Sequence, residues 1–307
     1  MGKNKKTLEE SLVDFLDCPC KIFQPMKNDK TLMKAYTEAQ ERAEKEGFVP
    51  VLVCCDNIEN LFESLIWNTD SEQENRKEFE FDKTAVRAFR EKMCKKELPD
   101  GKSVLEEWKK QYKEYIEDED WDDEDEYDDD EYDDDEYDDD EYDEDDDEYD
   151  EDDEYDDDEY DDDEYDDEDE YDEYYDDKDD YINTSLSAYH SYTSDKTTTV
   201  ILAEIPVAHP WEIFAWLPFG GWNECPDAED MMAISKYWYE TYGAVPATIS
   251  HDVLEYMLPE PVNKEDTKTL AWDMVAFCSD VVAQGDLDIR IFANSLAEST
   301  VWYFWWD

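Results

Sequence analysis

The run FVPVLVCC at residues 48–55 is apolar throughout and rich in valine. Such a run is typical of a strand that is buried on both faces of a sheet. Strand main-chain groups must be paired, so this strand needs neighbouring strands on both sides. Apolar residues at helical spacing predict a helix over 7–17, another over 30–46 and a third that begins with Asn57 as its N-cap. The helix–strand–helix order indicates an α/β-type packing unit.

The rest of the chain mixes strands and helices without a regular alternation. The pattern predicts strands over 197–207, 245–250, 252–258 and 300–307, and helices within 82–116 and over 228–242, 264–284 and 289–297. The stretch 209–227 holds three prolines and a glycine pair, which indicates an ordered loop flanking a short strand. The ending TVWYFWWD is apolar on both faces, which predicts a central strand. These elements predict an α+β fold, a mixed sheet with packed helices, interrupted by a disordered acidic segment.

A low-complexity tract divides the chain. Residues 117–180 hold 51 acidic residues and 11 tyrosines in 64 positions, with EYDDD as the recurring unit and a net charge of −50 out of −67. A segment so charged cannot bury enough apolar surface to fold. The predicted organisation is an N-terminal α/β segment of the fold at 1–116, a disordered acidic tract at 117–181 and a C-terminal α+β domain at 182–307. One core built from both flanking segments is favoured over two small domains, because the strand at 48–55 needs neighbours.

The sequence of the acidic tract leaves three interpretations open. The tract is a repulsive, solubilising spacer, or a polyanion that attracts basic partners, or a weak binding site for divalent cations such as Ca²⁺ and Mg²⁺. Hard cations favour oxygen ligands, but the tract has no preformed cage for them. Apart from this weak Ca²⁺ or Mg²⁺ binding, no cofactor is identified.

Outside the tract the composition is that of an ordinary acidic globular protein, with a net charge of −17 over 243 residues. The acidic balance argues against a nucleic-acid partner or an anionic membrane surface, because phosphates are repelled. No apolar run approaches 18 residues and no apolar signal segment is visible, so a cytoplasmic location is expected. The seven cysteines contain no Cys-x-x-Cys pair and are interpreted as buried free thiols, with no metal ligand assigned. The oligomeric state is left open.

The last part of the sequence carries a specific series of motifs. They are Trp238-x-x-x-Tyr242-Gly243-Ala244, Asp252-x-Leu254, Pro259-x-Pro261, Leu270-Ala271, Phe277-Cys278-x-Asp280 with Gln284, and the ending Trp302-x-Phe304-Trp305-Trp306-Asp307. Together with the loop GGWNECP at 220–226, this series resembles the bacterial domain-of-unknown-function family 4253. The resemblance covers about 198–307, with a weaker likeness over 31–55.

The resemblance implies an architecture and candidate residues, and it implies no activity. Two positions depart from the family pattern. Asp273 stands where the family usually has Glu, and Ser279 stands where it usually has Pro. Asp273 keeps the carboxylate but is shorter by one methylene. The acidic tract is not part of the family pattern.

The loop GGWNECP is the first candidate for a pocket. Gly220 and Gly221 permit a close approach of the backbone, and Trp222 and Asn223 add a ring and an amide. Cys225 lies just before a predicted helix, whose N-terminal dipole is expected to lower the pKa of a thiol. This makes Cys225 the best nucleophile candidate, although no His–Asp arrangement is positioned by sequence to complete a triad. The alternative is a packed turn that holds the tryptophan in the core.

Two further groups of residues are candidates for a site. Asp273, Asp280 and Gln284 are spaced seven and four residues apart, which places them near one face of the predicted helix. Two acids and an amide suit acid–base work or metal binding, and equally suit a solvated helix face. Trp306 and Asp307 end the sequence, and Asp307 is expected to carry a side-chain and a terminal carboxylate. That pair either binds a cation or a partner's basic group, or fixes the end of the strand.

The candidate residues are compatible with different classes of function. A non-enzymatic binding protein of the interaction or immunity type, with a basic protein as its partner, is favoured by many aromatic and acidic residues beside an incomplete catalytic set. One alternative is an enzyme with a pocket near Asn223, Cys225, Asp280 and Asp307. The other is weak divalent-cation binding by the acidic tract.

Overall fold

The computed structural model describes residues 6–72, 79–122, 181–283 and 289–307. The chain divides into two units, residues 1–116 with 177–307 and residues 117–176, and the fold below is that of the first unit. Most of the acidic tract lies outside the described residues, as do the predictions of its disorder, its cation binding and its attraction for basic partners. One helix, α5, continues to Asp122, past the predicted beginning of the tract.

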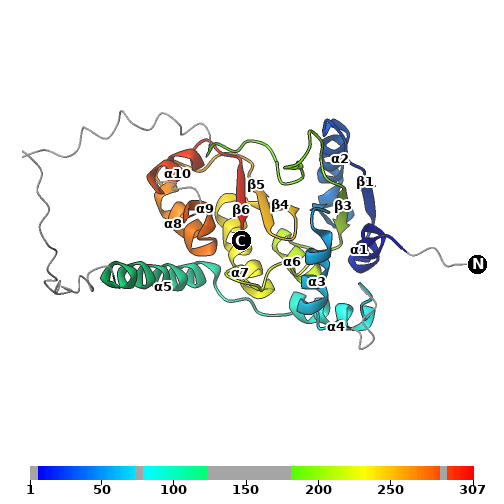
Figure 1. The fold of residues 1–307 in the computed structure, drawn as a ribbon, viewed down its shortest axis with the longest axis horizontal. Coiled ribbons are helices and arrows are strands. Elements are labelled where there is room, and N and C mark those ends of the chain that lie inside the picture. Colours follow the sequence, from blue (N-terminus) through cyan, green and yellow to red (C-terminus); the bar gives the residue numbers. More distant parts are fainter. Residues whose placement is uncertain (1–5, 73–78, 123–180, 284–288) are drawn as a thin grey trace, which may run out of the picture. The chain divides into compact units, whose positions relative to one another are not determined.

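Six strands of the described residues form one mixed sheet in the order β1-β3-β2-β4-β5-β6 (Figure 1). They are β1 (Cys20–Phe23), β2 (Val49–Cys54), β3 (Val200–Ile205), β4 (Val245–Ile249), β5 (Val253–Met257) and β6 (Val301–Trp305). Strand β2 lies between β3, to which it is antiparallel, and β4, to which it is parallel. The prediction that FVPVLVCC is a strand with neighbours on both sides is confirmed. Both neighbours come from the part of the chain that follows the tract.

Helices make up most of the connections between these strands. Before the tract they are α1 (Leu8–Leu16), α2 (Lys30–Glu46), α3 (Ile58–Asn68), α4 (Lys83–Cys94) and α5 (Gly101–Asp122). After it they are η2 (Pro210–Glu212), α6 (Ile213–Trp216), α7 (Ala228–Tyr242), α8 (Thr267–Phe277), α9 (Asp280–Ala283) and α10 (Ile289–Leu296). The predicted α+β class, a mixed sheet with packed helices, is confirmed.

The sheet buries apolar residues on both faces. On one face, which we call the helix-rich face, the strands pack against α1, α3, α4, α6, α7, α8 and α10. Its centre is an aromatic cluster in which Trp238 of α7 stacks on Phe304 of β6 at 5.5 Å and meets Phe277 of α8 edge-on at 4.8 Å. The other face, which we call the α2 face, packs against α2 and the segment around Tyr189. Both faces draw on residues from before and after the tract.

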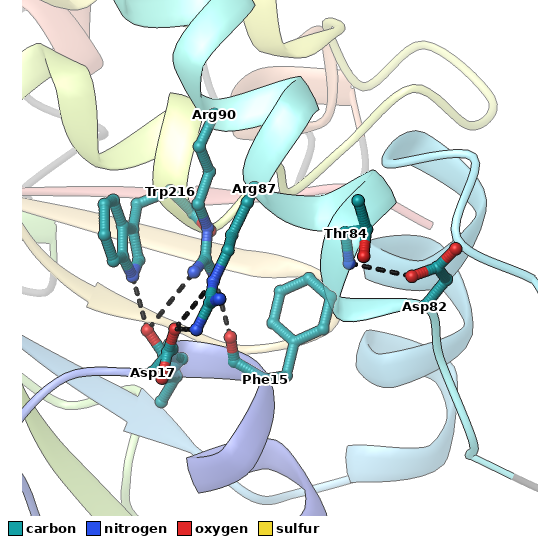
Figure 2. Close-up of polar contacts among 8 residues, drawn as sticks. Phe15, Asp17, Asp82, Thr84, Arg87, Arg90 and Trp216 are labelled. Atoms are coloured by element: carbon teal, nitrogen blue, oxygen red, sulfur yellow. Dashed lines mark hydrogen bonds and ion pairs between the residues drawn. The ribbon is translucent and has the colours of Figure 1, made fainter.

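A buried arginine on the helix-rich face closes the C-terminal end of α1. Arg90 of α4 is 4% exposed, and its guanidinium donates to the main-chain oxygens of Phe15 at 2.8 Å and Trp216 at 3.1 Å (Figure 2). The guanidinium lies 5.2 and 4.1 Å from the ring centroids of the same two residues. Burial lowers the pKa of Arg90 to about 10. Its hydrogen bond to Phe15 satisfies a carbonyl that has no partner within the helix.

The prediction of a central strand for TVWYFWWD is wrong, because β6 is an end strand of the described sheet. Both of its faces are nevertheless covered, since Trp302 packs on the helix-rich face and Val301 on the α2 face. The main-chain N–H of Val301 donates to the oxygen of Asn183 at 3.0 Å, from the segment that precedes β3. Apolarity on both faces therefore indicates that each face is buried, and it does not require a strand at each edge.

Two other predictions about elements need correction, and one strand was not predicted. The predicted helix over 264–284 is two helices, because α8 ends at Phe277, Cys278 is extended and α9 begins at Asp280. The stretch 209–227 contains η2 and α6 in place of the expected loop and short strand. Strand β1 escaped the sequence pattern because it is only four residues long, with three of the four not buried.

Candidate functional site

One edge of the sheet gathers several of the predicted site residues. Strands β2 and β4 are parallel, and β6 is antiparallel to β5, which is antiparallel to β4, so all three strands end at the same edge. The segments 55–57, 250–252 and 306–307 follow these strand ends, and we call this the carboxyl edge. In sheets with parallel strands, ligands bind in the crevice outside the carboxyl ends of the strands.

The GGWNECP loop is held by its glycines and by a neighbouring amide. Gly220 and Gly221 have φ angles of 88° and 78°, which other residues rarely adopt. A Cβ added at Gly220 would lie 2.2 Å from the main-chain oxygen of Pro226. Nδ2 of Asn68, the last residue of α3, donates to the main-chain oxygens of Pro218 at 2.9 Å and Gly220 at 2.8 Å. The loop is therefore held against α3 in a conformation that requires glycine at position 220.

Asn223, Asp280 and Asp307 lie together at the carboxyl edge. Nδ2 of Asn223 donates to the main-chain oxygen of Asp307 at 2.7 Å. The main-chain N–H of Asp307 in turn donates to Oδ2 of Asp280 at 3.1 Å. The hydroxyl of Ser279 donates to Oε2 of Glu224 at 2.8 Å, so the GGWNECP loop is also linked directly to the segment that contains Asp280. Three residues predicted for the site are thus brought together.

Cys225 belongs to the same loop but is buried. Burial raises the pKa of its thiol well above the ordinary value, and the neighbouring Cys278 acts in the same direction. The expectation that the N-terminus of α7 lowers this pKa is wrong, because desolvation of the thiolate outweighs the helix dipole. Trp306 is also a core residue, with its ring 5.4 Å from that of Phe277 and 5.7 Å from that of Phe219.

Asp273 has neighbours of its own, away from this group of contacts. It is buried in α8, and its Oδ1 accepts a hydrogen bond from Nζ of Lys109 of α5 at 2.5 Å. Burial raises the pKa of Asp273, and Lys109 opposes that rise. Because α8 ends before Asp280, the seven-residue spacing does not put the two acids on one helix face. Gln284 lies outside the described residues.

A pocket of about 300 Å³ opens beside the GGWNECP loop, and most of its lining was not found from the sequence. It is lined by Trp222 of the loop, His251 after β4, and the α3 residues Asn60, Glu63 and Ser64. These three α3 residues share one face of the helix because they are three and four positions apart. The sequence signal for them is a set of polar residues at helical spacing, directly after a buried strand.

His251 is positioned by groups from two strand ends. Its Nδ1 lies 3.0 Å from Oδ1 of Asp252, although the two atoms are not aligned for a hydrogen bond, and its Nε2 lies 3.3 Å from Nδ2 of Asn57. Asp252 also accepts hydrogen bonds from Oγ of Ser250 at 2.8 Å and Nε1 of Trp305 at 3.0 Å. Burial raises the pKa of Asp252, but His251 and these two donors outweigh burial and bring it below its ordinary value. Asp252 is therefore an anion at neutral pH.

The α3 face that lines the pocket continues with an exposed aromatic residue. Trp67 lies three and four positions beyond Ser64 and Glu63, and 76% of its surface is exposed. It directly precedes Asn68, the residue that holds the loop. A large side chain so exposed beside a pocket marks this surface as a candidate for contact with a partner.

Two features are absent from the described part of the chain. There, no three His, Cys, Asp or Glu side chains form a group that could hold a metal ion. None of the helices within the described ranges combines the length and the apolar character that crossing a membrane requires.

Comparison with known proteins assigns the C-terminal part of the chain to a family. No curated protein and no solved structure matches the chain. The family model of a domain of unknown function, DUF4253, matches residues 201–307. The match confirms the resemblance carried by the C-terminal motifs, while the weaker likeness over 31–55 lies outside the matched residues. Residues 201–307 are therefore a domain of the DUF4253 family.

Proposed function

We propose that this protein is a non-enzymatic binding protein that takes a basic side chain of a protein partner into the pocket at the carboxyl edge. The observation that carries this proposal is the combination of Trp222 and the carboxylate of Glu63 in one pocket, with exposed Trp67 on the adjoining helix turn. An aromatic face and an acid together favour a cation over an anion or an apolar group.

Arginine suits such a pocket better than lysine does. A guanidinium is planar, stacks on an aromatic ring and donates two parallel hydrogen bonds to a carboxylate. Trp222 supplies the ring and Glu63 the carboxylate. The side-chain oxygens of Asn60 and Ser64, on the same helix face, accept further N–H groups.

The charge of the chain supports a basic partner. The net charge of −67 attracts cationic proteins over long range, and association steered in this way is fast and depends on salt. Steering raises the association rate without choosing a partner, whereas a shaped pocket discriminates between side chains. The acidic tract and the pocket therefore have separate roles, one in the rate of encounter and one in recognition. An immunity protein that covers a basic target is one member of this class.

Binding of a fluorescently labelled arginine–glycine peptide, followed by anisotropy, tests the proposal. The same peptide with citrulline in place of arginine keeps the shape and removes the charge. Measurements in about 0.5 M salt weaken the attraction of exposed charges such as those of the tract. We expect Trp222→Ala and Glu63→Gln each to weaken binding by roughly 5- to 30-fold, which is about 1–2 kcal/mol for a lost cation–π contact or paired charge.

The matched control is Glu38→Gln, which removes one exposed acid from α2 on the other face of the sheet. This control should bind like the unchanged protein. Equal binding by all four proteins, or equal binding of the arginine and citrulline peptides, would show that the pocket does not recognise a basic side chain.

The enzyme alternative loses its nucleophile. Cys225 is buried with a raised pKa, and a thiol of this kind reacts slowly because the thiolate is the reactive form. Among the residues proposed for that alternative, Asn223 and Asp280 are engaged in the contacts around Asp307. The contacts on the described surface therefore favour binding over catalysis.

A further inference from the structure

We propose that Cys18 and Cys20 form a redox-active dithiol, which closes to an intramolecular disulfide on reaction with a low-molecular-weight disulfide such as oxidised glutathione. The two Sγ atoms lie 3.8 Å apart across Pro19, and both residues are partly exposed. A disulfide bond is about 2.05 Å long, so closure requires the two sulfur atoms to move closer together than their present separation.

The backbone on both sides of this pair is fixed, which keeps the sulfur atoms near one another. Asp17 ends α1 in the left-handed conformation, with its N–H bonded to the oxygen of Val13. The oxygen of Pro19 accepts a hydrogen bond from the N–H of Glu204 at 2.9 Å, and Cys20 pairs with Ala203 in the sheet. The proline ring further limits the conformations of the segment.

Arg90 holds the residues just before the pair. Its guanidinium bonds the main-chain oxygen of Phe15, and Nε1 of Trp216 donates to the oxygen of Leu16 at 2.6 Å (Figure 2). Arg87 bridges to Asp17 at 2.9 Å from its position one turn earlier on α4. The residues that precede Cys18 are therefore held in place by contacts from α4 and α6 as well as by their position at the end of α1.

The hydrogen bond between the two sulfur atoms makes them unequal. Either sulfur can be the donor of this contact; with the Cys18 S–H as donor, the bond lowers the pKa of Cys20, and the same bond together with burial raises the pKa of Cys18. The thiolate is the form that attacks a disulfide. We therefore assign the attack to Cys20 and the resolving step to Cys18, and single-serine variants distinguish this order from the reverse.

The other cysteines differ from this pair. Cys54, Cys225 and Cys278 are buried with raised pKa values, and burial raises the pKa of Cys55 to about 12. Cys94 is exposed, and burial of part of its surface raises its pKa. The expectation that all seven thiols are buried is wrong for Cys18, Cys20, Cys55 and Cys94.

The reaction balances with oxidised glutathione as the oxidant. The Cys20 thiolate attacks one sulfur of glutathione disulfide, which forms a mixed disulfide and releases one glutathione thiolate. Cys18 then loses its proton to solvent, and its sulfur attacks Sγ of Cys20. The protein disulfide forms, and the second glutathione leaves as a thiolate. Two electrons pass from the protein dithiol to glutathione, and reduced glutathione reverses both steps.

The test uses the full chain in glutathione buffers of increasing oxidised-to-reduced ratio. Samples are quenched in acid, alkylated and digested with trypsin, which releases residues 7–21 as one peptide that contains Cys18 and Cys20 and no other cysteine. Circular dichroism before quenching checks that the protein is folded. We expect this peptide to lose two hydrogen atoms in mass and both alkylation sites.

Variants distinguish the two roles. Cys18→Ser should trap glutathione on Cys20 as a stable mixed disulfide, whereas Cys20→Ser should leave Cys18 reduced in the same buffer. Cys94→Ser, the control that removes an exposed single thiol, should leave the oxidation of peptide 7–21 unchanged. A peptide 7–21 that stays fully alkylated at every ratio while Cys94 takes up glutathione would overturn the proposal, as would disulfides formed only between chains.

Discussion

Both faces of the sheet are buried, but the side chains that are buried on them differ. The helix-rich face buries large rings, with Trp238, Trp302 and Phe304 packed against one another. The α2 face buries fewer apolar residues, among them Tyr36 and Tyr189, and also a carboxyl group, that of Glu255, which is fully buried. The difference indicates that the helix-rich face supplies most of the apolar stabilisation. The α2 face fixes the position of the segment around Ser187, which follows the acidic tract.

Glu255 makes this anchoring specific. Its Oε1 accepts hydrogen bonds from the main-chain N–H of Ser187 at 2.7 Å and from its hydroxyl at 3.1 Å. Its Oε2 and the hydroxyl of Thr248, its cross-strand partner, are buried without an aligned hydrogen-bond partner among the described residues. Burial raises the pKa of Glu255. The buried carboxyl group of Glu255 on the α2 face therefore positions Ser187, but its burial lowers the free energy of unfolding.

The largest effect is expected from Trp238→Ala on the helix-rich face. Trp238 is fully buried and touches the rings of Phe277, Trp302 and Phe304. Removing it leaves a large cavity, so the free energy of unfolding in urea should fall by about 3–5 kcal/mol. Trp67→Ala, which removes an exposed tryptophan on the same face of the fold, should change it by less than about 0.5 kcal/mol. Similar losses for the two variants would contradict the central place given to the aromatic cluster.

A smaller effect is expected from Arg90→Met, which tests whether polar groups also matter on the helix-rich face. The change leaves the buried oxygens of Phe15 and Trp216 without the guanidinium and should cost about 2 kcal/mol in a urea titration. Arg87→Met is the matched control, since Arg87 makes an exposed ion pair with Asp17. It should cost at most about 1 kcal/mol. If Arg90→Met is as stable as the unchanged protein, the desolvation of the guanidinium cancels its hydrogen bonds.

The smallest effect, and one of opposite sign, is expected from Glu255→Gln on the α2 face. A carboxyl whose pKa is raised by folding contributes full stability below its unfolded pKa of about 4.3, and that contribution is lost as the pH rises through the folded value. Gln keeps an acceptor for Ser187 and adds a donor for the hydroxyl of Thr248. Glu255→Gln should therefore be more stable than the unchanged protein by about 1 kcal/mol at pH 7.

Unfolding in urea at pH 4 and pH 7 measures this difference. The advantage of Glu255→Gln should shrink at pH 4, where both side chains are neutral. Other acids with raised pKa values, such as Asp230 and Asp273, are present in both proteins and cancel in the comparison. Glu38→Gln, with an exposed acid, should show no advantage at either pH. An advantage that is equal at both pH values would mean that Gln acts by packing and not by removing a charge.

Much of the fold could be predicted because local pattern and final environment agree. The helix over 30–46 has its apolar residues at one spacing and Gly47 in the left-handed conformation at its end. FVPVLVCC is buried on both faces as its composition indicates. Prediction failed where the environment of a strand depends on a segment far away in the sequence. Strand β6 is an end strand whose first N–H group donates to the oxygen of Asn183, a contact that no local sequence pattern reveals.

The site was predictable only in part, for related reasons. Asn223, Asp280 and Asp307 were found because they belong to recognisable motifs, and they do meet. The electrostatic prediction for Cys225 failed, because a helix N-terminus is visible in a sequence but burial of the thiol is not. The pocket residues on α3 and His251 were missed, because only the parallel pairing of β2 with β4 brings them to one edge.

The pairing of β2 has a consequence for how the protein is made. Val49 of β2 pairs with Ile205 of β3, and Val53 pairs with Ile249 of β4, so the first half of the chain emerges from the ribosome with an apolar strand that has no partner. At a synthesis rate of about 5–20 residues per second, that strand waits roughly 10–40 seconds for residue 249. Residues 55–116, with α3, α4 and most of α5, and then the tract with its charge of −50 emerge while the strand is unpaired. The pairing of β2 on both sides therefore forms only after the whole tract has been synthesised.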